Sequence, residues 1–274
     1  MNGGIYFMFK VLTAFILLAL VSCSPLSAGE IETITLTDIV RERDTSMLVG
    51  ASEKDLAKYV PDGKLKNQIL AFLVKVSGNE ILFDAGLQDG HVAAELERSG
   101  FSPSGIKTIL LTHLHPDHFG GLVSLDGKAQ FPDAQIYVSK PEYDYWVNEL
   151  KNENVINALA LYSGKIHTFM FGDEVVAGVK AIDTTGHTPG HTSFLVEAGG
   201  QRLIVAGDII HFIEIQLPVP DVAVIYDVDP AKAVQSRKFL LDYAALKNIP
   251  VAGMHIASPN IITVRKSENG YEKY

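Results

Sequence analysis

The chain has 274 residues, of which 47% are hydrophobic, and a formal net charge of −9 at pH 7. This composition supports a sizeable core and excludes disorder of the whole chain. The acidic balance argues against a nucleic-acid partner, which would need clustered Lys and Arg. The single cysteine excludes a disulfide within the chain and a zinc site built from several cysteines.

An apolar run near the N-terminus predicts export. Residues 11–21 (VLTAFILLALV) are too few to span a bilayer as a helix, but they suit the hydrophobic region of a signal peptide. The tail of the run, with the two residues after it, reads Leu20-Val21-Ser22-Cys23 and resembles the lipobox of bacterial lipoproteins. This resemblance implies a periplasmic protein held at the membrane by a lipid on Cys23. A plain cleaved signal with an incidental Cys23 is the alternative. We therefore expect a signal peptide over residues 1–23, a tether over residues 24–34 and a single domain over residues 35–274.

Within the domain, strands and helices follow one another. Apolar runs at 69–76 and 80–83, joined by a Ser-Gly-Asn turn, predict two neighbouring strands. Strand-rich halves, each followed by helices, predict an α/β (α+β) fold, an αββα sandwich of two facing mixed sheets with helices on the outer faces. The further strands are expected at 106–112, 135–138, 175–182, 192–197, 202–206 and 251–256, and the helices at 92–99, 141–150 and 230–246.

A histidine-rich run follows the strand expected at 106–112 and reads His113-Leu114-His115-Pro116-Asp117-His118. Residues two apart on extended backbone point the same way, so His113, His115 and Asp117 can converge while His118 faces another side. Ligands that face two sides suit two metal ions rather than one. Imidazoles with carboxylates fit divalent zinc, with manganese, iron or cobalt as alternatives, whereas calcium would want mostly oxygen.

Three later segments complete a pattern of motifs. They are Gly186-His187-Thr188-Pro189-Gly190-His191, then Gly207-Asp208, then His255. Over roughly residues 65–260, this order resembles the metallo-β-lactamase superfamily. The resemblance implies two metal ions, one held by His113, His115 and His187, the other by Asp117, His118 and His255, with Asp208 as the bridge between them.

Two more residues are assigned by the same resemblance. Asp84, in an Asp-Ala-Gly turn, resembles the family's buttress for a ligand imidazole, and capping of its own turn is the alternative. His191 is expected to support the ligands rather than to bind metal.

Departures from other branches of the superfamily narrow the function. No cysteine follows Cys23, which excludes the β-lactamases that use a Cys ligand, and His115 stands where the diiron redox branch usually has Glu. Asp208 is typical of lactonases, phosphotriesterases, thioesterases and nucleases of the fold. The segments 207–211, 227–230 and 252–259 look closest to the methyl parathion hydrolase-like branch.

The resemblance implies a hydrolase that uses a metal-bridging hydroxide to cleave a small ester, lactone or organophosphate. Asp117 would orient the nucleophile and carry away its proton. His211 would donate to the developing oxyanion or, alternatively, pack against the sheet edge. Aromatic residues between 143 and 171, and Phe212, either line the pocket or belong to the core. A thioester or phosphodiester hydrolase of this fold and a non-enzymatic metal-binding lipoprotein are the alternative functions.

The lipobox predicts the chemistry of the mature N-terminus. In a bacterial host we expect mass spectrometry to find the protein beginning at Cys23 with acyl groups attached, and Cys23→Ala to release it from the membrane fraction. An unmodified N-terminus downstream of Cys23 would contradict the lipid anchor.

Overall fold

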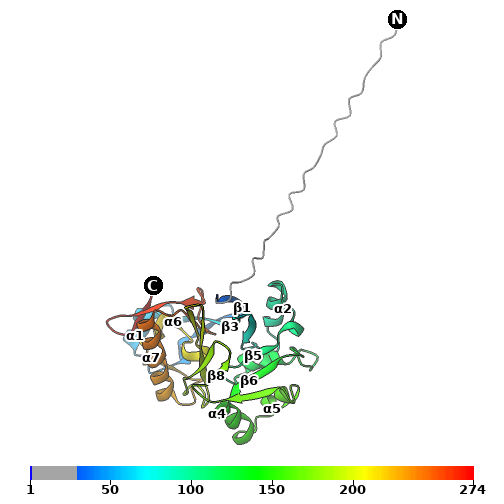
Figure 1. Cartoon of the computed structure of the whole chain (residues 1–274). Coiled ribbons are helices and arrows are strands. Elements are labelled where there is room, and N and C mark those ends of the chain that lie inside the picture. Colours follow the sequence, from blue (N-terminus) through cyan, green and yellow to red (C-terminus); the bar gives the residue numbers. More distant parts are fainter. Residues whose placement is uncertain (2–29) are drawn as a thin grey trace.

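Two six-stranded sheets lie face to face in the computed structural model, which describes Met1 and residues 30–274 (Figure 1). Apart from Met1, the expected signal peptide lies outside the described residues, as does the lipobox. The first strand, β1 (Glu32–Asp44), begins within the stretch expected to be a tether, so residues 32–34 belong to the domain. No helix among the described residues has the length and apolar character needed to cross a membrane.

The first sheet is mixed, as expected. Strands β1, β3 and β4 pair antiparallel, and β4 to β7 pair parallel. The order is β1, β3 (Lys64–Val76), β4 (Asn79–Phe83), β5 (Thr108–Leu110), β6 (Gln135–Ser139) and β7 (Ile166–Phe169).

The second sheet is also mixed. Its strands β9, β11 and β13 run in one direction, because β10 pairs antiparallel with both β9 and β11 while β11 pairs parallel with β13. Their carboxyl ends therefore lie at one edge. The order is β14 (Ile261–Ile262), β13 (Val251–Ala252), β11 (Gln201–Val205), β10 (Thr192–Ala198), β9 (Val179–Asp183) and β8 (Glu174–Val176). Two short ribbons pair β2 (Leu48–Val49) with β12 (Ala223–Val224), and β15 (Val264–Lys266) with β16 (Tyr271–Lys273).

Side chains that alternate along the strands build the core. On β3, Phe72 and Val74 point toward the second sheet, whereas Leu73 points toward the helices outside. Between the sheets, Phe83 meets Phe194 of β10 with ring centroids 5.4 Å apart. Both faces of the central strands are covered, which explains why their sequences are continuous apolar runs.

Helices cover both outer faces. Helices α2 (Val92–Arg98) and α5 (Glu153–Ala160) pack on the first sheet, and α7 (Pro230–Lys247) packs on the second. Helix α7 begins after Asp229, whose side chain accepts a hydrogen bond from the Lys232 amide. The helix ends before Asn248, which lies in the left-handed region. Short helices occupy the loops: α1 (Glu53–Tyr59), α3 (Pro116–Phe119), α4 (Lys140–Tyr143), a π-helical turn (Asp144–Glu149) and α6 (Ile213–Gln216).

The αββα sandwich is thus confirmed, while two of the expected strands differ and one observed strand was not predicted. The strand expected at 175–182 is a hairpin, because Gly178 turns the chain at a φ of 80°. The strand expected at 251–256 ends at Ala252, which places His255 in a turn. The whole of β1 was missed, because a register shift between Thr37 and Ile39 breaks its alternation.

Candidate metal centre

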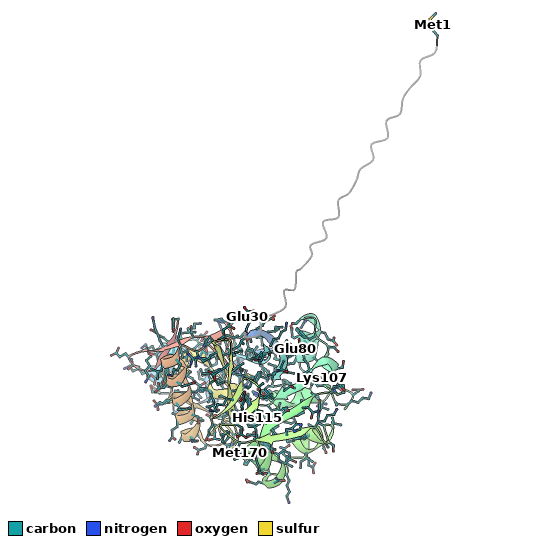
Figure 2. All side chains as sticks on the ribbon, viewed as in Figure 1. Met1, Glu30, Glu80, Lys107, His115 and Met170 are labelled. Carbon is teal, nitrogen blue, oxygen red and sulfur yellow. The ribbon has the colours of Figure 1, made fainter. Side chains whose placement is uncertain are left out.

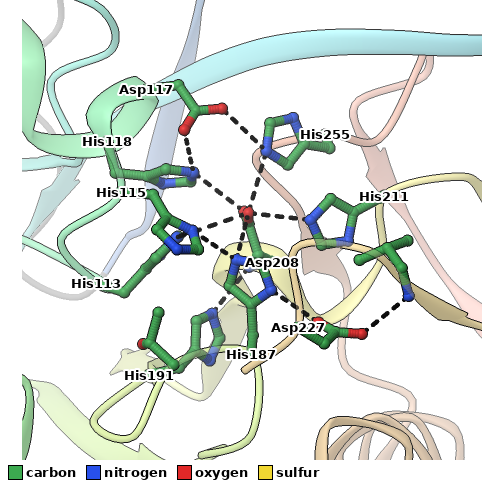
Figure 3. Close-up of polar contacts among 12 residues, drawn as sticks. His113, His115, Asp117, His118, His187, His191, Asp208, His211, Asp227 and His255 are labelled. Atoms are coloured by element: carbon green, nitrogen blue, oxygen red, sulfur yellow. Dashed lines mark hydrogen bonds and ion pairs between the residues drawn. The ribbon is translucent and has the colours of Figure 1, made fainter. Parts of the chain in front are cut away.

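The candidate ligands all lie on loops that follow the carboxyl ends of strands. The 113–118 run follows β5 of the first sheet, and His187, Asp208 and His255 follow β9, β11 and β13 of the second. Figure 3 shows their side chains pointing toward one centre. In the view of the whole molecule, the labelled His115 lies inside its outline (Figure 2).

The structure brings together every ligand that the sequence predicted, in two groups that could each hold a metal ion. In the first group, His115 Nδ1 lies 3.0 Å from His113 Nε2 and 2.9 Å from His187 Nε2. In the second, Asp117 lies between two imidazoles, with its oxygens 3.7 Å from His118 Nε2 and 3.5 Å from His255 Nε2.

Asp208 lies between the two groups. Its Oδ2 is 3.2 Å from His187 Nε2 and 3.1 Å from His255 Nε2, and its Oδ1 is 3.3 Å from His118 Nε2. Burial alone would raise the pKa of this carboxyl, but the surrounding imidazoles, His118 and His255 foremost, hold it well below its usual range. Asp208 is therefore an anion at the centre of the site.

Outer hydrogen bonds orient four of the five ligand imidazoles. In each, Nδ1 is engaged away from the centre, so that Nε2 is turned inward. The partners are the Thr112 hydroxyl for His113 (3.1 Å), the Asp84 carboxylate for His118 (2.7 Å), the Asp227 carboxylate for His187 (2.8 Å) and the Gln68 carbonyl for His255 (2.7 Å).

Asp84 is a buttress, as the resemblance implied. It lies in the left-handed region at a φ of 59°, and its carboxylate accepts hydrogen bonds from the amide and hydroxyl of Thr112 at 2.7 and 2.8 Å as well as contacting His118. These partners come from the loop after β5 rather than from the turn of Asp84 itself. Capping of that turn is thus not its role.

Asp227 orients His187 as Asp84 orients His118, and this role was not predicted from the sequence. Burial disfavours the charged imidazole of His187, but hydrogen bonds with Asp208 and Asp227 outweigh that effect and raise its pKa to about 9. Asp227 lies 40 residues from His187 in sequence, with no motif that connects them.

Both ring nitrogens of His191 form hydrogen bonds within the protein. Its Nε2 accepts a hydrogen bond from the Asp208 amide at 2.9 Å, and its Nδ1 therefore carries the proton that it donates to the Thr184 carbonyl at 3.0 Å. Burial, reinforced by the charge of His187, lowers the pKa of His191 to about 3. These contacts agree with the expectation that His191 supports the ligands, which stays a prediction.

Glu142 was not identified from the sequence, where it lay within the helix expected at 141–150. It is fully buried, and its carboxylate accepts four hydrogen bonds. Two come from the Leu114 amide (2.8 Å) and the Trp146 indole (2.7 Å), and two from the Thr188 hydroxyl (2.7 Å) and the Gly190 amide (2.9 Å). Glu142 thereby ties the loop that carries His115 to the loop that carries His187.

Several buried polar atoms in the centre fit bound cations. His118 Nε2, Asp208 Oδ1 and both ring nitrogens of His211 form no hydrogen bond with any described residue. His118 Nε2 and Asp208 Oδ1 face each other at 3.3 Å without the geometry of a hydrogen bond. Buried polar atoms normally have partners, and these are nitrogen and oxygen donors of the kind that divalent transition metals prefer.

His211 lies against this centre rather than at a sheet edge. Its Nε2 is 3.2 Å from Asp208 Oδ2, and its ring stacks on that of His255 with centroids 5.0 Å apart. Burial lowers the pKa of His211 to about 4, so its imidazole is neutral. The Gln216 side chain fixes its backbone by accepting from the His211 amide at 2.8 Å.

A cavity of about 330 Å³ opens onto the centre. Its apolar wall includes Phe212, as the sequence allowed, together with Leu87, Pro116 and Tyr226. The aromatic residues between 143 and 171 are not among the described residues that line it. The other residues that line the cavity are polar or charged: Arg41, Arg43, Asn67, His115, Asp117, His187, Asp208, His211 and His255.

Residues 66–252 match the family described as the metallo-beta-lactamase superfamily. The chain belongs to this superfamily. The match covers the candidate ligands up to Asp208, and its span agrees with that expected from the motifs. The narrower resemblance to the methyl parathion hydrolase-like branch stays a prediction.

Several proteins similar to the chain are named as hydrolases. The chain is 29% identical over 140 residues to an N-acyl homoserine lactonase of Bacillus cereus, covering 46% of this chain and 51% of that one, so it spans about half the length of such lactonases. Among solved structures, the hydrolase AbOPH of the β-lactamase superfamily is 31% identical with a TM-score of 0.81, covering 90% and 94% of the two chains. AidC, a dizinc quorum-quenching lactonase, is 27% identical with a TM-score of 0.82, covering 91% and 95%. Fold, site and relatives are those of a metal-dependent hydrolase.

The four hydrogen bonds of Glu142 predict a measurable role in metal binding. In Glu142→Gln the amide nitrogen would face two donors whichever way it turned, so two hydrogen bonds would be lost and the loops would loosen. We expect unfolding to become easier by about 2–4 kcal/mol and zinc to bind roughly tenfold more weakly. Denaturant titration and competition with a chelating dye measure the two effects.

The exposed Glu149 provides the matched control, because Glu149→Gln changes the same groups outside the site. It should alter neither quantity. Should Glu142→Gln bind zinc as tightly as the parent, Glu142 would stabilise the fold without positioning the ligands.

Proposed function

We propose that the protein is a dinuclear metal-dependent hydrolase of small esters, lactones or organophosphates. The observation that carries the proposal is the position of Asp208, a buried anion shared by two ligand groups at the end of a cavity. Relatives that act on N-acyl homoserine lactones, and the two zinc ions of AidC, support a lactone or ester in particular.

Two groups of residues would hold the metals. His113, His115 and His187 would bind one ion, Asp117, His118 and His255 the other, with Asp208 between them. The donors favour zinc, with manganese, iron or cobalt as alternatives. Bound there, two divalent cations would supply an acidified water and a Lewis acid for the scissile carbonyl or phosphoryl oxygen.

Asp117 would orient the attacking water and accept its proton. Burial alone would raise the pKa of Asp117, but the charges of His118 and His255 lower it overall, so the side chain is ionised. The side chain is 27% exposed and lines the cavity, which puts a carboxylate oxygen within reach of a bound substrate.

His211 would act on the other side of the reacting atom. As a neutral imidazole facing the cavity, it can donate one N–H to the oxygen that gains negative charge as the water adds. Phe212 and Tyr226 would bind the apolar part of the substrate and keep bulk water away from it.

A substrate panel tests the proposed function. The protein loaded with zinc is expected to hydrolyse p-nitrophenyl esters or a homoserine lactone faster than paraoxon and bis-p-nitrophenyl phosphate, which represent the organophosphate and phosphodiester alternatives. Metal content is measured on the same sample. Two bound ions with no turnover of any of the four substrates would favour a non-enzymatic metal-binding protein and overturn the proposal.

Asp117→Asn tests the assignment of the proton acceptor. The amide cannot take up the proton of the attacking water, so we expect turnover per bound metal to fall by a factor of about 10²–10⁴ while the fold stays intact. Turnover, metal content and circular dichroism are compared with Asp126→Asn, which changes an exposed aspartate paired with Lys128. Full turnover per metal in Asp117→Asn would show that the assignment is wrong.

A further inference from the structure

Two arginines form a positively charged wall of the cavity, on the strand that the sequence did not reveal. Arg41 and Arg43 lie two apart on β1 and so share one face of the strand. Arg41 is paired in register with Asn67 of β3, which puts Asn67 on the same face. All three line the cavity that holds Asp117 and His255.

The two guanidinium groups form no direct ion pair, although hydrogen bonds from Ser46 and, to a smaller extent, the charge of Arg43 lower the pKa of the exposed Asp44 beside them. Neither forms a hydrogen bond or ion pair with any residue from 30 to 274. The acidic residues beside them on β1 are engaged elsewhere: Glu42 pairs with Lys64 at 2.8 Å, and Asp44 accepts from the Ser46 amide at 2.8 Å.

This arrangement is unusual for an acidic chain. With 32 acidic and 23 basic residues, carboxylates are abundant, yet two half-buried arginines lie two residues apart without one. Like charges held close together and partly out of water repel each other. An anion between them and the metal centre would reduce that repulsion. It would also accept hydrogen bonds from the guanidinium N–H groups.

We propose that Arg41 and Arg43 form a subsite for a carboxylate on the substrate, distant from the bond that is broken. The inference rests on the proposed hydrolase function and narrows it to esters or lactones that carry an acidic group. The planar guanidinium fork matches a carboxylate with two parallel hydrogen bonds, and the Asn67 amide can add a third donor. The small cavity suits a short acyl chain that joins the carboxylate to the scissile carbonyl.

A pair of esters that differ only in the distal charge tests the subsite. p-Nitrophenyl hydrogen glutarate carries a carboxylate, and p-nitrophenyl butyrate lacks it. We expect the parent protein to prefer the acidic ester, and the ratio of the two kcat/KM values to fall about tenfold in Arg41→Gln and in Arg43→Gln. Arg41→Lys should recover part of the preference, since it keeps the charge without the fork.

Arg98→Gln is the matched control. Arg98 is an exposed arginine on α2 that pairs with Glu95 outside the cavity, so its removal should leave the ratio unchanged. A parent protein without preference for the acidic ester, or a preference that survives in Arg41→Gln and Arg43→Gln together, would overturn the subsite.

A binding measurement separates the subsite from the proposed function. Calorimetry on the zinc-loaded protein compares glutarate, with two carboxylates, against butyrate, with one. We expect glutarate to bind more tightly, and each Arg-to-Gln variant to reduce that advantage about tenfold. If no ester is hydrolysed but the advantage depends on the arginines, the subsite stands and the hydrolase proposal fails. If both esters are hydrolysed and glutarate has no advantage, the hydrolase proposal stands and the subsite fails.

Discussion

The buried carboxylate of Asp208 is the constraint around which the molecule is built. Moving an isolated carboxylate out of water costs several kcal/mol even after the protein relaxes, so a buried anion needs positive or polar partners on every side. Here imidazole nitrogens from four separate loops approach its two oxygens at 3.1 to 3.7 Å. Those loops come from both sheets. The facing arrangement of the sheets, with β9, β11 and β13 ending at one edge, is what brings them to a single point.

A second layer of carboxylates holds the imidazoles in place. Asp84 and Asp227 each contact the outer nitrogen of one imidazole. Glu142 accepts hydrogen bonds from backbone amides of the loop that carries His115 and of the loop that carries His187. Asp208 is therefore surrounded by imidazoles, and three buried acidic side chains lie behind these imidazoles and their loops. These outer contacts, together with those of Thr112 and the Gln68 carbonyl, give four of the five ligand imidazoles a defined direction before any metal binds. The loops are also interdependent, because Gly190 approaches so closely that a Cβ there would lie 2.1 Å from the Glu142 amide nitrogen.

The parts of this design that were predictable from the sequence are the local ones. The 113–118 run places four side chains within six residues, and the apolar runs of β3 and β4 are visible without knowledge of their neighbours. The roles of Glu142 and Asp227 were not predictable in this way, because the metal-site loops that they contact lie 28 to 48 residues away and only the packed fold brings them together. Strand β1 was hidden for a related reason. It is an edge strand with a register shift, and beyond that shift its inward face carries Arg41 and Arg43 where a core strand would carry apolar residues.

Those arginines matter because the chain as a whole is acidic. The field of a net charge of −9 would disfavour an anionic substrate at long range, yet salt screens charges beyond roughly 8 Å at physiological ionic strength. Inside the cavity the nearest fixed charges decide, and there the two arginines line the same cavity as the candidate metal ligands. Binding of an acidic substrate is thus governed by the wall of β1 rather than by the chain's overall charge. Strand β1, which the sequence did not reveal, thus carries the residues that select the substrate of the metal centre.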